Sequence, residues 1–126
     1  MIDISPYMKL WVDIRMMSVD LFSVEKVYDY LPGEDIEYPF VFIGEQFKQN
    51  ERFHKDYLNG RTQVTIHFWH DSHKKRGSLA SMMYELEKTL QQQYKSKLLE
   101  VNTQMLPDNS TGKELIHGIV EANIQF

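Results

Sequence analysis

The sequence predicts an α+β fold: a mainly antiparallel sheet of about four to five strands with two helices packed on one face. Three observations support this. Two stretches have apolar residues at helical spacing, several others have the period-two alternation of half-buried strands, and the order along the chain is helix, strands, helix, strands. Because 126 residues suit one hydrophobic core, we expect residues 1–126 to form a single domain.

The first helix is expected from about Pro6 to Ser18. Ser5 is a typical N-cap residue, and proline suits the first helical position. The apolar residues at three- and four-residue steps, which define the packed face, are Tyr7, Leu10, Trp11, Ile14 and Met17.

The stretch from Tyr38 to Gly44 is expected to be the central strand, because Val41, Phe42 and Ile43 follow one another without a polar break. A first strand is expected from Lys26 to Leu31, which is rich in strand formers and ends at a Pro-Gly turn. The short acidic link between the two strands favours an antiparallel hairpin.

The partner of the central strand is expected from Arg61 to Trp69. Its apolar residues Val64, Ile66 and Phe68 alternate with polar ones, as in a strand with one buried face. Almost all the residues before it are polar, which predicts a long hairpin loop at about 46–60 that ends in a tight reversal at Asn59-Gly60.

The second helix is expected to begin with Ser78 as its cap. Its apolar stripe is Leu79, Met82, Met83, Leu86, Leu90 and Tyr94. Two period-two sets follow on either side of a polar loop at 107–112, which predicts an antiparallel pair of strands at about 99–105 and 116–126.

Composition excludes several classes of function. The formal net charge of −4 supplies no basic field for holding nucleic acid, and the absence of cysteine excludes disulfides, thiolate metal sites and a cysteine nucleophile. The first residues lack the pattern of a signal peptide, so we expect a cytosolic chain when it is made.

One cluster has side chains suited to chemistry. His70, Asp71 and His73 are close in sequence, and His67 is an obvious further metal ligand. Strand alternation, however, places His67 and His70 on opposite faces of the sheet. Solvated turn residues are therefore the preferred interpretation, and a small metal-binding or hydrolytic domain using the cluster is kept as the alternative function. No serine-hydrolase elbow or phosphate-binding glycine loop is present.

Apolar surface indicates assembly instead. If Val64, Ile66 and Phe68 face the helices, then Thr65, His67 and Trp69 face outward, and an outward tryptophan on a polar strand invites a partner. Together with Phe42 of the central strand, these residues are the candidate subunit-interface residues. A subunit of a ring would bury such a surface against its neighbours.

The sequence resembles the tail-completion or tail terminator (head-tail joining) family of long-tailed bacteriophages. The resemblance covers about residues 1–95 and rests on Val27-Tyr28 with Leu31-Pro32, on residues 38–45, on Gly60 leading into residues 64–69, and on a helix that opens near Gly77. The last third is similar only in its strand-loop-strand layout.

The resemblance implies a structural protein, not an enzyme, with no cofactor and no bound metal. Such proteins form a ring, here expected to be a homohexamer, at the head-proximal end of the tail tube. The implied partners are the tail tube protein and the head connector protein, and DNA passes through the ring without specific binding. The implied location is the virion, with the host cytoplasm during assembly.

The family's long hairpin loop typically contacts neighbours and the tube. By position that loop is residues 46–59 here, and Phe53 and Tyr57 are apolar points within it that could dock onto a partner. The candidate contact residues are Lys48, Arg52, Phe53, His54, Lys55 and Tyr57.

Overall fold

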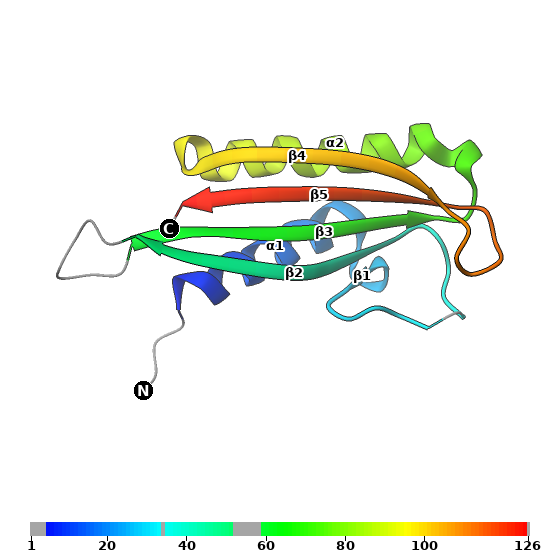
Figure 1. Ribbon diagram of the computed structural model, residues 1–126, viewed down its shortest axis with the longest axis horizontal. Coiled ribbons are helices and arrows are strands. Elements are labelled where there is room, and N and C mark those ends of the chain that lie inside the picture. The colour runs from blue at the N-terminus through cyan, green and yellow to red at the C-terminus, as the bar shows by residue number, and fades with distance from the viewer. Residues whose placement is uncertain (1–4, 34, 52–58, 126) are drawn as a thin grey trace.

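The computed structural model describes residues 5–33, 35–51 and 59–125. Two helices and five strands make up the fold, in the order α1 (Pro6–Phe22), β1 (Val27–Tyr28), β2 (Phe40–Glu51), β3 (Asn59–His70), α2 (Arg76–Tyr94), β4 (Leu98–Asp108) and β5 (Leu115–Gln125). The strands form one sheet in the order β1-β2-β3-β5-β4. Figure 1 shows both helices behind this sheet, on the same face. The predicted α+β class is confirmed.

The short first strand departs from the predicted hairpin. Strand β1 pairs with β2 in parallel, through Val27 with Val41 and Tyr28 with Phe42. The strand formers near Tyr30 do not extend it, because Pro32-Gly33 opens a long connection that returns the chain to the start of β2. The prediction of an antiparallel hairpin with a polar loop between the two strands was therefore wrong.

Strands β2 and β3 are much longer than predicted. Residues 46–51 and 59–60 belong to these strands, so the prediction of a loop at about 46–60 was wrong for them, and Asn59-Gly60 opens a strand instead of reversing the chain. The polar residues remain in the sheet because they are hydrogen-bonded. The amide Nε2 of Gln46 donates to the Tyr7 carbonyl at 2.7 Å and to the Thr62 hydroxyl at 3.0 Å.

The strand that the sequence placed at the centre lies near one edge. Beyond the two residues paired with β1, the same side of β2 is bonded to no strand within the described residues. Strands β3 and β5 occupy the middle of the sheet. The unbroken apolar run at 41–43 has a different cause: Val41 and Ile43 enter the core, and Phe42 lies on the opposite face against the ring of His67.

The core lies between the sheet and the two helices. Helix α1 runs four residues past Ser18, whose buried hydroxyl donates to the Ile14 carbonyl at 2.9 Å, and Phe22 in its last turn packs edge-on against Phe68. Val64, Ile66 and Phe68 are fully buried, as the alternation predicted.

Helix α2 begins at Arg76, so the prediction of Ser78 as its cap was wrong. The N-cap position is Lys75, which makes no side-chain capping bond. The predicted apolar stripe is confirmed: Leu79, Met83, Leu86, Leu90 and Tyr94 are buried, and Met82 is partly buried against them. The absence of a side chain at Gly118 lets β5 approach this helix, since a Cβ there would lie 2.5 Å from the Met83 sulfur.

Strands β4 and β5 form the predicted antiparallel pair. The register shifts between Leu98 and Glu100, and this irregularity leaves Leu99 exposed instead of continuing the alternation predicted with Val101. Strand β4 is the outermost strand on its side of the sheet.

Candidate interaction surface

The face of the sheet opposite the helices carries the predicted interface residues. Because side chains alternate along a strand and Ile66 and Phe68 enter the core, Thr65, His67 and Trp69 of β3 lie on the other face. Neither helix covers this face (Figure 1). Phe42 of β2 is directly opposite His67 in the register, so the structure brings the four predicted residues together.

An aromatic and histidine cluster occupies one end of this face. His117 of β5 is opposite Trp69, and their rings stack with centroids 3.8 Å apart and planes 6° apart. The ring of His67 stacks on His117 at 5.0 Å, and Phe42 meets His67 edge-on at 5.5 Å. Phe40 lies parallel to Trp69 at 6.3 Å. These five rings, which we call the aromatic cluster, connect β2, β3 and β5.

Much of the aromatic cluster is packed within the subunit. Thr65 beside it is only 8% exposed and Phe40 only 5%, while Phe42, His67 and Trp69 are half-buried. A cavity of about 160 Å³ opens beside the rings and is lined by Leu31, Phe42, Glu45, His67, Trp69 and His117. This volume is below the roughly 300–1,000 Å³ typical of small-molecule sites. The cavity beside the rings is therefore smaller than a typical ligand site, and a second hollow of about 470 Å³ on the same face is lined by Thr65, His67 and Glu121 among others.

A chain of hydrogen bonds crosses the cluster. His67 Nε2 lies 3.1 Å from a carboxylate oxygen of Glu45, and His67 Nδ1 lies 2.8 Å from His117 Nε2. An ionised carboxylate only accepts, so His67 donates from Nε2. A neutral His67 then accepts at Nδ1, and His117 donates from Nε2. The contacts thus fix one tautomer for each ring.

The surroundings of His117 favour its neutral form. Burial and, to a smaller extent, the nearby His67 lower the pKa of His117 to about 4, against smaller opposing effects of Asp108 and Glu45. Burial is the main cause of this preference, because a protonated His117 could donate the same hydrogen bond from Nε2 to His67.

Sequence reasoning missed His117 and Phe40. The signal for His117 was available, because it alternates with the buried Ile116 and Gly118 and must therefore share the outer face. Its position beside Trp69 was not available, since that depends on the register between β3 and β5.

The predicted contact loop is only partly described. Lys48 lies within β2, and its Nζ is 5.8 Å from the centre of the Tyr7 ring on α1. The other five predicted contact residues fall outside the described residues: Arg52, Phe53, His54, Lys55 and Tyr57.

The residues of the metal alternative do not converge. His70 is on the helix side of β3 and contacts its neighbour Asp71, whereas His73 pairs with Glu114 at 3.2 Å. Among residues 5–33, 35–51 and 59–125, no three histidine or acidic side chains are arranged to hold a metal ion.

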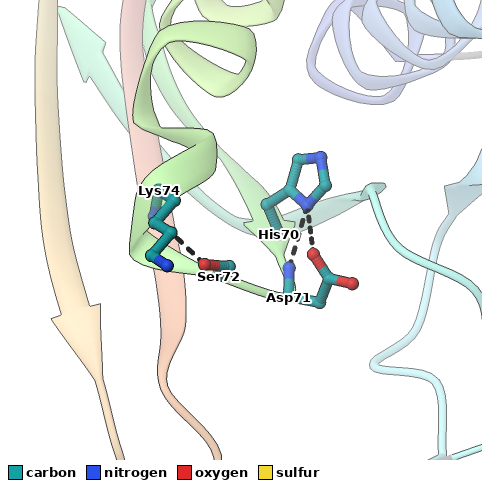
Figure 2. A network of polar contacts seen from close by, with 4 residues as sticks. All are labelled: His70, Asp71, Ser72 and Lys74. Carbon is teal, nitrogen blue, oxygen red and sulfur yellow. Dashed lines mark hydrogen bonds and ion pairs between the residues drawn. The ribbon is translucent and has the colours of Figure 1, made fainter.

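The His70 region instead shapes the turn between β3 and α2 (Figure 2). The backbone N–H and a carboxylate oxygen of Asp71 both lie 2.9 Å from His70 Nδ1. These two hydrogen bonds are alternatives, because the first needs an unprotonated Nδ1 and the second a protonated one. The hydroxyl of Ser72 accepts from the Lys74 N–H at 3.1 Å and caps the short turn.

Within the described part of the chain, no helix is long and apolar enough to cross a membrane.

Comparison with known proteins gives a likeness of fold. No protein-family model matches the chain, and no curated protein sequence matches it. Among solved structures, the chain is similar to a chain of the virion of a native gene transfer agent particle. The two share 10% sequence identity with a TM-score of 0.51, over 94% of this chain and 91% of that one. At this identity the likeness establishes a shared architecture that extends over nearly the whole of both chains.

Proposed function

We propose that this protein is a structural component of a phage-like virion. The observation that carries the proposal is the fold shared with a virion chain over 94% of this sequence. The resemblance of residues 1–95 to phage tail-completion proteins rests on sequence motifs and not on the fold. It also indicates a structural protein of a phage-like virion. No observation favours the metal-binding or hydrolytic alternative, because its three residues belong to separate pairs.

Within that class we propose a ring, expected to be a hexamer, at the head-proximal end of the tail tube. It ends the tube and joins it to the head connector. The net charge of −4 supports a channel through which DNA passes without being held. Exposed apolar side chains on β2 and β4, among them Phe47 and Leu106, support burial between subunits.

Purified tail tubes provide the test. The protein should bind one end of each tube as a ring visible by electron microscopy, and tubes assembled in its presence should stop growing. Light scattering and native mass spectrometry should give the number of subunits. A protein that stays monomeric on its own and also never binds a tube end would overturn the proposal.

A further inference from the structure

The sheet has two open edges, one on each side. Strand β4 is bonded to β5 on one side and to no described strand on the other. On the far side of the sheet, β1 covers β2 only at Val41 and Phe42, so no described strand pairs with that side of residues 43–51, although the Gln46 carbonyl accepts from the Tyr7 hydroxyl at 3.1 Å. Open edges present unpaired N–H and C=O groups that can bind another strand.

The edge formed by β4 lacks the usual protection over about half of its length. From Val101 to Leu106, β4 has neither a charged residue nor a proline, the residues that commonly block edge pairing. Large apolar side chains are also exposed at both edges: Phe47 on β2 is 66% exposed, and Leu99 and Leu106 on β4 are 45% and 40% exposed. The β4 edge therefore has the properties of a strand-pairing surface, and the β2 edge exposes an apolar side chain but also carries Glu45 and Lys48 and an irregular register between Ile43 and Gln46.

The strand directions make a second copy of this chain a fitting partner. The pairs β2 with β3, β3 with β5 and β5 with β4 are all antiparallel, so β2 and β4 run in opposite directions. A copy placed beside the first in the same orientation brings its β2 next to β4 as an antiparallel strand. This head-to-tail contact uses two different surfaces, which is the kind of contact that closes into a ring.

The two open edges also lie at the same level of the sheet. Following the register across the strands, Lys48 is level with Leu98 through Thr62 and Ile124, and Ile43 is level with Thr103 through Ile66 and Val120. Residues 43–48 of β2 are therefore level with residues 98–103 of β4, whereas Gln104 and Met105 are level with Phe42 and Val41, where β1 already lies.

The charged residues beside the start of β4 also bear on the contact between subunits. A groove of about 540 Å³ runs between α2 and the start of β4, and two of its lining residues, Glu87 and Glu100, are acidic. Its one basic lining residue, Lys88, is already paired with Glu85 at 2.8 Å. Lys48 on the opposite edge is level with Leu98, which lines this groove, and its Nζ lies 5.8 Å from the centre of the Tyr7 ring of its own subunit.

We infer that the ring contact is a strand pair, in which residues 98–103 of β4 in one subunit align antiparallel with residues 43–48 of β2 in the next and the sheet continues from subunit to subunit. This inference rests on the proposed ring and names the surface that forms it.

Because the chain has no cysteine, cross-linking tests the contact directly. Gln49→Cys on β2 and Glu100→Cys on β4 replace exposed residues at the two edges. With both cysteines in one chain, a short bis-maleimide should give a ladder of oligomers on a denaturing gel, in solution or on tube ends. A mixture of the two single variants should give covalent dimers. The matched control, Lys74→Cys with Thr111→Cys, lies at exposed positions away from both edges and should give no ladder.

A charge-insertion pair provides a second measurement. Asn102→Lys with Thr103→Lys should raise the concentration needed for assembly by about tenfold or more, because it places like charges on the pairing edge. Ser110→Lys with Thr111→Lys adds the same charge in the β4–β5 loop and should leave assembly unchanged.

The outcomes separate the two proposals. Rings that form without the ladder would overturn the strand pair and leave the proposed function standing. No ring in solution or on tubes would remove the proposed function and the inference with it. A ladder with the edge pair and none with the control pair supports both.

Discussion

The indole of Trp69 and the imidazole of His117 lie 3.8 Å apart with their planes within 6° of parallel, although 48 positions separate them in the chain (117 − 69). This stack joins the two inner strands of the sheet on the face that the helices leave open. It excludes water from one side of the imidazole, and the burial that results underlies the lowered pKa of His117.

Stability should therefore fall as the solution becomes acidic. The pKa of His117 is about 4 in the folded protein against an ordinary value of 6.5, so between these values the unfolded chain binds the extra proton. The contribution of His117 to the free energy of unfolding is fully present above about pH 7 and is lost as the pH falls toward 4. We expect a loss of about 1–2 kcal/mol, reduced from the full linkage value because the ring is half-exposed.

Urea denaturation at pH 7.5 and pH 5.0 would measure this loss. His117→Phe keeps an aromatic ring beside Trp69 and removes the titrating group, so the variant should show a smaller loss between the two pH values than the parent protein. Equal losses in both proteins would show that His117 does not contribute.

Phe68 should be among the most sensitive positions in the core. It is fully buried on β3 and meets Phe22 of α1 edge-on at 5.8 Å, so Phe68→Ala should lower the free energy of unfolding by about 3–5 kcal/mol. Phe47→Ala removes the same side chain from an exposed position of the neighbouring strand and should change the stability of the monomer by less than about 0.5 kcal/mol. Chemical denaturation compares the two, and similar losses would contradict the burial described.

Gly118 and Met83 should be energetically coupled. A Cβ at position 118 would lie 2.5 Å from the Met83 sulfur, so Gly118→Ala should destabilise the protein by about 1–3 kcal/mol. In a Met83→Ala background the same change should cost clearly less, because the obstructing side chain is gone. A double-mutant cycle measures this coupling, and simple additivity would argue against the close approach of β5 to α2.

Two serines near helix starts should behave differently. The hydroxyl of Ser5 accepts the Met8 N–H at 3.1 Å and caps α1, so Ser5→Ala should cost about 1 kcal/mol. Ser78 looks like a cap in the sequence but lies inside α2, and Ser78→Ala should change stability by less than about 0.5 kcal/mol. Thermal unfolding of both variants checks this, and a larger effect at Ser78 would contradict the helix start at Arg76.

Local patterns were enough to predict the fold class and the buried faces. The apolar stripe of α2 and the alternation of Val64, Ile66 and Phe68 depend on periodicity alone, and the structure confirms both. The lengths of β2 and β3 were missed for a physical reason. Their polar residues are stabilised by bonds to distant parts of the chain, such as Gln46 with Tyr7, and no local pattern contains such a bond.

For the candidate interaction surface, too, one part could be predicted from the sequence and another could not. Alternation placed Thr65, His67 and Trp69 on one face, but it could not bring His117 to Trp69, because strand register is a long-range property. The direction of β1 was missed for a related reason. The short acidic link favoured an antiparallel hairpin with a polar loop, whereas the observed connection returns the chain to the end of the sheet where β1 began, so that β2 runs parallel to β1.

The two-residue strand β1 also limits how any partner can slide along β2. It occupies the side of β2 at Val41 and Phe42, so an incoming strand meets a physical stop next to Ile43. Strand β1 therefore blocks movement of the partner strand past Ile43 toward Val41, whatever side chains the partner carries there. In a head-to-tail assembly this stop acts once in every subunit and would give all subunits the same offset. A strand too short to stabilise a sheet can in this way set the alignment of a whole assembly.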